Sequence, residues 1–126
     1  MIAAELEKVL DDIKRFVPET LGVIVASDEG LPIAHVISKA LSIQDSIVIA
    51  GLLSSATAMV QNVLNEFGDR DFQMVFVQGG EISILVGVIE GFYIGFITTA
   101  NVKLGPLFME FKKQREKIYE IVKAYM

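Results

Sequence analysis

Three consecutive β-rich runs, Phe72–Gln78, Ile82–Ile89 and Phe92–Thr99, constrain the fold of this chain more than any other feature. Only Gly79-Gly80 and Glu90-Gly91 separate them, and such short connections join antiparallel neighbours as hairpins. An antiparallel sheet with one face in water alternates apolar and polar residues. These runs carry large apolar residues on both sides instead. The sequence therefore predicts an antiparallel sheet that is covered on both faces.

A second pair of β-rich runs precedes these three. Leu21–Ser27 and Leu31–Ser38 are separated only by Asp28-Glu29-Gly30. A short acidic connector that ends in glycine is typical of a hairpin, because glycine adopts the positive φ angle that such turns need. The two runs therefore predict a further hairpin and bring the expected strands to five.

Three segments with helical periodicity can supply the cover. Residues 3–16 place an apolar stripe opposite a charged face. Asp45 can cap a longer helix that runs to about Phe67, where Gly68 ends it. A last helix is expected to begin near residues 101–105.

These elements predict the order α-β-β-α-β-β-β-α. Since three helices must cover the two faces of one sheet, we expect two helices on one face and one helix on the other. The expected fold is therefore a three-layer α/β/α sandwich around a five-stranded antiparallel sheet. No repeat, linker or low-complexity stretch divides the sequence, so residues 1–126 are expected to form a single domain.

The middle helix carries no charge between Asp45 and Glu66. A helix with one side in solvent normally carries Lys and Glu on that side, so a helix without charge is expected to be buried on two sides. We assign to the sheet the stripe Ile49, Leu52, Leu53, Ala56, Val60, Val63, Leu64 and Phe67. Small residues on the other side would let a second helix approach closely, and the simplest such helix belongs to a second copy across a two-fold axis. A loop or terminus of the same chain that covers this side is the alternative.

Residues 46–65 are also long enough to span a bilayer. Several serine and amide side chains interrupt this stretch and no Lys/Arg cluster flanks it, so we expect no transmembrane segment. The formal net charge of −5 argues against nucleic-acid binding. The chain has no cysteine, which excludes disulfides and thiolate chemistry and is compatible with the cytoplasm.

No catalytic residue, metal site or cofactor is expected. His35 is the only histidine, and a metal site usually needs three or four good ligands. The acidic pair Asp11/Asp12 fits a solvated helix face. Gly79-Gly80 lacks the Gly-Lys-Ser/Thr ending of a phosphate-binding loop.

One basic cluster lies on the last helix and comprises Lys112, Lys113, Arg115 and Lys117. These residues most simply form the solvent-exposed side of the helix, where positive charge also complements the helix dipole. A contact with an acidic partner or an anionic membrane surface is the alternative.

The hairpin sequence LGVIVASDEGLPIAHV at residues 21–36, the element order and the segment Ile97–Asn101 together resemble the Roadblock family, also called the dynein light-chain Roadblock family. The resemblance covers nearly the whole chain. It implies that the middle helix covers one face of the sheet, and that two copies dimerise through this helix and the third strand, Asp45–Phe67 and Phe72–Gln78. The interface residues expected from both elements are Val48, Gly51, Ser54, Ser55, Ala58, Met59, Gln61, Asn62, Phe72, Met74 and Phe76.

The resemblance implies a non-enzymatic, cytoplasmic homodimer that binds and regulates a small Ras-like GTPase. No catalytic residues come with it. One alternative is a structural light-chain subunit of a larger complex. Another is a small-molecule sensor similar to PAS or GAF domains, which would need an internal cavity with a few convergent polar groups.

Overall fold

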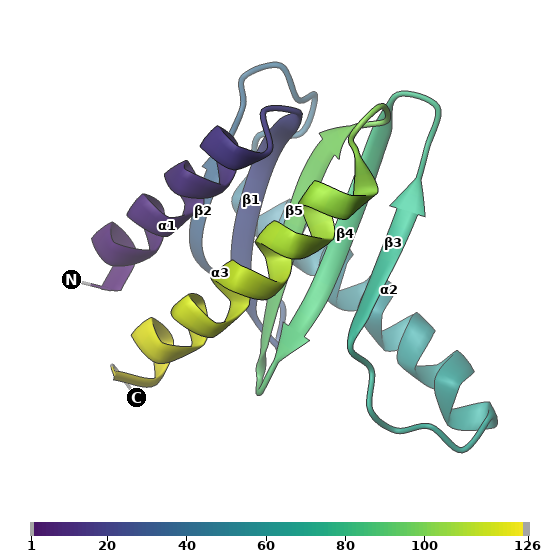
Figure 1. The fold of residues 1–126 in the computed structure, drawn as a ribbon. Helices are drawn as coiled ribbons and strands as arrows, with labels where there is room; N and C mark the ends of the chain where they lie inside the picture. Colours follow the sequence, from purple (N-terminus) through teal and green to yellow (C-terminus); the bar gives the residue numbers. More distant parts are fainter. Residues whose placement is uncertain (1, 125–126) are drawn as a thin grey trace.

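Eight elements follow one another in the order expected from the sequence (Figure 1). The computed structural model describes residues 2–124, so Met1, Tyr125 and Met126, at the ends of the expected domain, lie outside the described residues. The elements are α1 (Ile2–Phe16), β1 (Thr20–Ser27), β2 (Pro32–Ile37), α2 (Ser46–Glu66), β3 (Met74–Gln78), β4 (Ile82–Ile89), β5 (Phe92–Thr99) and α3 (Leu104–Ala124).

The five strands form one antiparallel sheet in the order β2-β1-β5-β4-β3, which confirms the expected sheet. β5 lies at the centre, between β1 and β4. β2 and β3 form the two edges. After the β1–β2 hairpin, the chain crosses to the opposite edge of the sheet through α2. In the sequence, α2 therefore separates β1 and β2 from the other three strands.

Two of the three predicted hairpin turns have the expected position. Gly30 and Gly91 have φ angles of 87° and 86°, which glycine adopts without strain. The third turn differs by one residue. The Gly79 N–H donates a hydrogen bond to the Ile82 carbonyl at 2.8 Å, so Gly80 and Glu81 are the two turn residues instead of Gly79 and Gly80.

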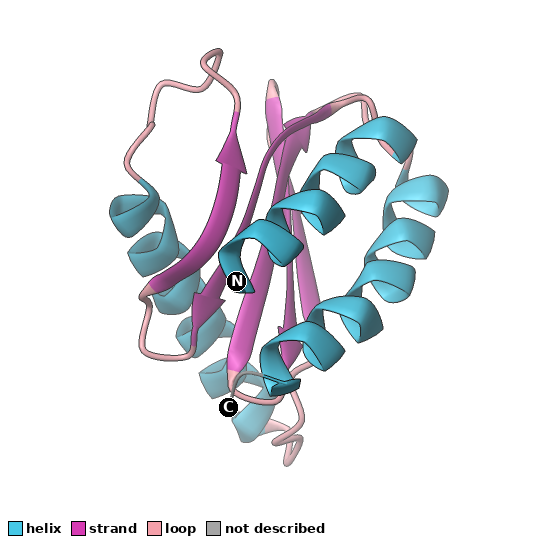
Figure 2. Cartoon of the chain, turned by 90° about the vertical axis from the view of Figure 1, so that its left-hand side faces the viewer, coloured by secondary structure: helices cyan, strands magenta, loops and turns pink. Residues whose placement is uncertain are grey.

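The helices form two layers around the sheet (Figure 2). α1 and α3 lie on one face and enclose the larger core, and α2 lies alone on the other face. This arrangement confirms the three-layer α/β/α sandwich. The largest fully buried side chains include Phe96 and Phe111, whose rings meet edge to face at a centroid distance of 5.7 Å. Aromatic pairs favour this geometry because the positive ring edge meets the negative ring face.

α3 packs closely against the sheet at Gly87. A methyl group added to Gly87 would lie 1.7 Å from Cζ of Phe111, far inside van der Waals contact. The absence of a side chain on this residue of β4 therefore lets the Phe111 ring reach the sheet, where it meets Phe96.

α2 crosses the sheet obliquely, and its C-terminal end lies beyond the edge strand β3 (Figure 1). Its buried residues are Ile49, Ala50, Leu53 and Thr57, all within the first 12 of its 21 residues. The sheet-facing stripe predicted from the sequence is therefore wrong in part. Leu52, Val63 and Phe67 are 55%, 55% and 84% exposed. Leu52 lies beside the buried residues Ile49 and Leu53 but does not join them, and Phe67 lies at the end of the helix that has passed the edge of the sheet.

The close approach at Gly87 yields a stability prediction. Gly87→Ala should lower the free energy of unfolding by about 1–3 kcal/mol, because the added methyl overpacks the core against Phe111. Gly105→Ala is the matched control, since its methyl meets nothing within 4 Å, and it should change stability by less than about 1 kcal/mol. Urea unfolding of both variants measures the difference, and equal stabilities would contradict the packing described.

Candidate functional site

An exposed, uncharged stripe runs along the side of α2 that faces away from its buried residues. Val48, Leu52, Ser55, Met59 and Asn62 are all exposed and are spaced alternately by four and three residues. Leu52 and Met59 are 55% and 65% exposed. Alternating spacing of this kind is typical of helices that pack side by side, because it keeps one seam in line along the helix. The stripe contains no charged residue, so its burial against a second helix would leave no charge unpaired.

The strand edge beside this helix is also open. β3 pairs with β4 on one side, and no described strand pairs with its other side. Val75 and Val77 lie on the α2 side of β3, and Val77 is 58% exposed. An unpaired edge offers a row of N–H and carbonyl groups to a further strand.

An apolar hollow of about 240 Å³ lies between the start of α2 and the sheet. It is lined by Leu41, Ser42, Ile43, Ile49, Leu52, Leu53, Ile82, Ile84 and Ile97. Ser42 is the only polar side chain among them. We call the exposed stripe, the open edge of β3 and this hollow the α2–β3 face. Its chemistry suits the burial of apolar side chains and the pairing of backbone groups.

Length and composition would also allow α2 to cross a membrane. In the structure, Ile49, Ala50 and Leu53 instead form part of the smaller core against the sheet. Leu53 reaches the sheet over Gly95, where an added methyl would lie 2.4 Å from Cδ1 of Leu53. One side of α2 is thus packed within the domain.

The expected interface residues on α2 do not all lie on the stripe. Val48, Ser55, Ala58, Met59 and Asn62 are exposed and lie on it or beside it. The other three, Gly51, Ser54 and Gln61, are partly buried by their own chain.

Gly51 and Ser54 lie under the β1–β2 turn. A methyl added to Gly30 would lie 3.2 Å from Cβ of Ser54 and 3.7 Å from Cα of Gly51. The Ser54 hydroxyl donates a hydrogen bond to the Asp28 carbonyl at 3.4 Å. A loop of the same chain, which was the alternative at the sequence level, therefore covers this part of the helix.

Gln61 connects α2 to the segment that leads into β3. Its Oε1 accepts a hydrogen bond from the Phe72 N–H at 3.2 Å, and its Nε2 donates to the Asp69 carbonyl at 3.4 Å. Phe72 is only 7% exposed, so its amide has little access to water. The side chain of Gln61 thus fixes the position of the segment that connects α2 to β3.

Met74 and Phe76, which were expected in the interface, point to the opposite face of the sheet from α2. Both pack against the larger core, and the Phe76 ring meets Phe108 of α3 edge to face at 6.1 Å. Sequence reasoning placed Leu52 on the sheet and did not single out Val77. The spacing of Leu52 by four residues from Val48 and by three from Ser55 was the sequence signal that could have assigned Leu52 to the exposed stripe.

The basic cluster of α3 lies on its outer side. Lys112, Lys113 and Lys117 are exposed, whereas Arg115 is partly buried and its guanidinium lies 6.0 Å from the centre of the Phe111 ring. The structure therefore separates Arg115 from the three lysines. Nζ of Lys113 lies 4.6 Å above the ring of Phe16 at the end of α1.

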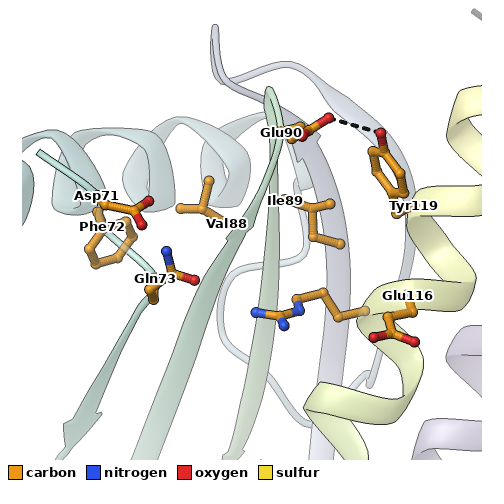
Figure 3. Close-up of a pocket in the computed structure, with 9 residues that line it drawn as sticks. Asp71, Phe72, Gln73, Val88, Ile89, Glu90, Glu116 and Tyr119 are labelled. Carbon is orange, nitrogen blue, oxygen red and sulfur yellow. Dashed lines mark hydrogen bonds between the residues drawn. The ribbon is translucent and has the colours of Figure 1, made fainter.

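A second hollow, of about 450 Å³, lies between α3 and the start of β3 (Figure 3). Charged side chains of both signs surround it, among them Asp71, Glu116 and Arg115. At its rim the Tyr119 hydroxyl donates a hydrogen bond to Glu90 Oε2 at 2.8 Å. This bond raises the pKa of Tyr119 above its ordinary value, with smaller contributions from desolvation and from nearby carboxylates. Over residues 2–124, no group of three or more His, Asp or Glu side chains could hold a metal ion.

The fold and this face define a class of protein, a small α/β/α domain with an exposed, uncharged helix stripe beside an open sheet edge. The model of the Roadblock/LC7 domain matches residues 5–91. This chain belongs to the Roadblock/LC7 domain family. No curated protein sequence matches the chain.

Solved structures share the fold over nearly the whole chain. A structure described as MglB with tetrameric arrangement has a TM-score of 0.90 at 19% identity and covers 99% of this chain and 93% of its own. The gliding protein MglB from Thermus thermophilus has a TM-score of 0.86 at 18% identity, with coverages of 98% and 92%. A Roadblock/LC7 domain from Streptomyces avermitilis has a TM-score of 0.84 at 17% identity, with coverages of 94% and 98%.

The contacts of Gln61 yield a second stability prediction. Gln61→Ala should lower the free energy of unfolding by about 1–2 kcal/mol, because the Phe72 amide loses its acceptor in a largely buried position. Gln73→Ala, at an exposed position of the same connection, is the control and should leave stability within about 0.5 kcal/mol of the parent chain. If chemical denaturation gives both variants the same stability, Gln61 has no such structural role.

Proposed function

We propose that this chain is a non-enzymatic, homodimeric Roadblock scaffold that binds and regulates a small Ras-like GTPase in the cytoplasm. The observation that carries the proposal is the uncovered α2–β3 face, which combines an uncharged helix stripe with an open strand edge. Contiguous apolar surface of this kind marks an interaction site in soluble proteins.

A two-fold axis beside β3 and perpendicular to the sheet explains both halves of this face. The axis pairs the two β3 edges as antiparallel neighbours and joins two five-stranded sheets into one. It also places α2 antiparallel to α2 of the second copy, so that the stripes meet near Ser55 and Met59. Such an isologous contact is the commonest way in which soluble proteins self-associate.

The same axis gives the projecting end of α2 a place to pack. In an antiparallel pair, the end of one helix lies beside the start of the other. Phe67, which is 84% exposed, would then approach the apolar hollow of the other copy at Ile43, Leu52 and Ile84. The solved MglB structure with a tetrameric arrangement supports self-association of this fold. We therefore propose that α2 is an interface helix and does not span a membrane.

Regulation of a GTPase is the role that the Roadblock family implies. Without catalytic groups of its own, a scaffold changes the activity of a GTPase by binding one arrangement of its switch segments more tightly than the other. The partner then shifts towards the arrangement that is bound. A structural light chain would use the same face and fold and would differ only in its partner.

Self-association is tested at Ser55. We expect light scattering to give twice the chain mass at micromolar concentration, and Ser55→Lys to shift it towards a single chain mass, because it places a charge at the centre of the stripe on both copies. Ala4→Lys adds the same charge at an exposed position of α1, on the opposite face of the sheet, and should leave the mass unchanged. A parent chain that stays at a single chain mass would rule out the homodimer.

The GTPase partner is tested by affinity capture from native lysate, in parallel with excess GDP and with a non-hydrolysable GTP analogue. We expect one Ras-like GTPase to be retained in a manner that depends on the nucleotide, because the scaffold distinguishes the two switch arrangements. Retention of other proteins without any GTPase in either state would contradict the regulator and favour the light-chain function.

A further inference from the structure

Charge is distributed unequally between the layers of the molecule. Residues 2–16 and 103–124, which form α1 and α3 with the residue before α3, hold nine of the 11 Lys and Arg residues and seven of the 16 Asp and Glu residues. Residues 17–102 hold the remaining two basic and nine acidic residues. An acidic chain thus carries its excess of positive charge on one helical layer, which faces away from α2 (Figure 2).

One part of this layer combines positive charge with exposed apolar side chains. Phe16, at the end of α1, and Met109, on α3, are 59% and 74% exposed. Lys113 lies over the Phe16 ring, and Met109 and Lys112 lie within one turn of Lys113 on the same helix. We call Phe16, Met109, Lys112 and Lys113, together with Lys14 and Arg15, the basic–apolar patch.

Acidic side chains close to the patch offset only part of its charge. Glu116 is exposed within one turn of Lys112 and Lys113, but it forms no ion pair with either among the described residues. Asp12 lies 3.8 Å from Arg15 and offsets that residue. Glu110, although it lies between Met109 and Lys112 in sequence, is only 7% exposed and accepts a hydrogen bond from Gln114 Nε2 at 2.6 Å. Lys14, Lys112 and Lys113 therefore remain without an ion pair within the described residues.

We propose that the basic–apolar patch is a docking surface for an anionic lipid membrane. The lysines complement the negative surface potential of such a membrane. Phe16 and Met109 project from the helices, and the interfacial region of a bilayer accepts projecting apolar side chains without a shaped partner surface. An acidic protein would need a hollow that matches both side chains, which makes lipid the better match.

This inference rests in part on the proposed homodimer. The proposed two-fold axis runs perpendicular to the sheet, so it places the α1–α3 layers of both copies on the same side of the joined sheet. Two patches then face one membrane together, and binding of the first raises the effective concentration of the second. The α2 layer and any partner bound there would remain on the side away from the lipid.

The test is co-sedimentation of the full chain with vesicles of phosphatidylcholine alone and with vesicles of equal amounts of phosphatidylcholine and phosphatidylserine. We expect binding only to the second kind and a loss of binding at high salt. The double variant Lys112→Glu/Lys113→Glu should reduce the vesicle affinity at least about tenfold. Phe16→Ser should also weaken binding, and this loss should persist at low salt because it removes an apolar contact.

The matched control is Lys39→Glu/Arg70→Glu, which makes the same change of net charge at the only two basic residues outside the helical layer. It should bind vesicles as the parent chain does. Equal losses in both double variants, or no binding of the parent chain to phosphatidylserine vesicles, would overturn the proposal. Light scattering on the same samples separates the two ideas. A parent chain of twice the chain mass that ignores the vesicles overturns only the membrane surface, whereas a single chain mass contradicts the homodimer whatever the vesicles show.

Discussion

The width of the sheet is the constraint on which the rest of the structure depends. Strands lie about 4.8 Å apart, so five strands place the two edges about 19 Å from each other, whereas a packed helix is only about 10 Å wide. Two helices can cover one face of such a sheet, and α1 and α3 do so. A single helix cannot cover the other face. Since β3 and β4 are as apolar towards α2 as towards α3, the uncovered half becomes the α2–β3 face.

The two faces of the sheet therefore differ in character although their composition is similar. The α1–α3 side is a closed core in which Phe111 fits against Gly87. On the α2 side the helix is fixed at points along its length. Leu53 reaches the sheet over Gly95, the β1–β2 turn lies on Ser54, and Gln61 holds the connection to β3. These contacts set the direction in which the exposed stripe points. A partner would consequently meet a surface that is already ordered, which lowers the entropic cost of binding.

Much of this fold can be predicted from the sequence, because hairpin turns, helix caps and two-sided apolar strands are local signals. Asp45 caps α2 and Gly91 forms its turn as expected. The candidate site is harder to predict. An uncharged helix shows that two sides are buried, but it does not show which residues face the sheet, since the crossing angle decides that. Leu52 was for this reason assigned to the sheet core, although it is 55% exposed and borders the hollow beside the sheet. The contacts of Gln61 depend on the path of a loop, which has no periodicity that a sequence could reveal.

The strand order has a consequence for how a cell makes this protein. The central strand, β5, is the last strand to be synthesised, and the 64 residues 28–91 separate it from its neighbour β1 in the sequence. Until β5 leaves the ribosome, the β1–β2 hairpin and the β3–β4 hairpin have no strand between them, and the apolar side of α2 has no complete sheet to cover. A nascent chain in that state exposes several strand edges at once, which favours aggregation. The sheet can therefore assemble only at the end of synthesis, and the nascent chain most needs chaperones before β5 has left the ribosome.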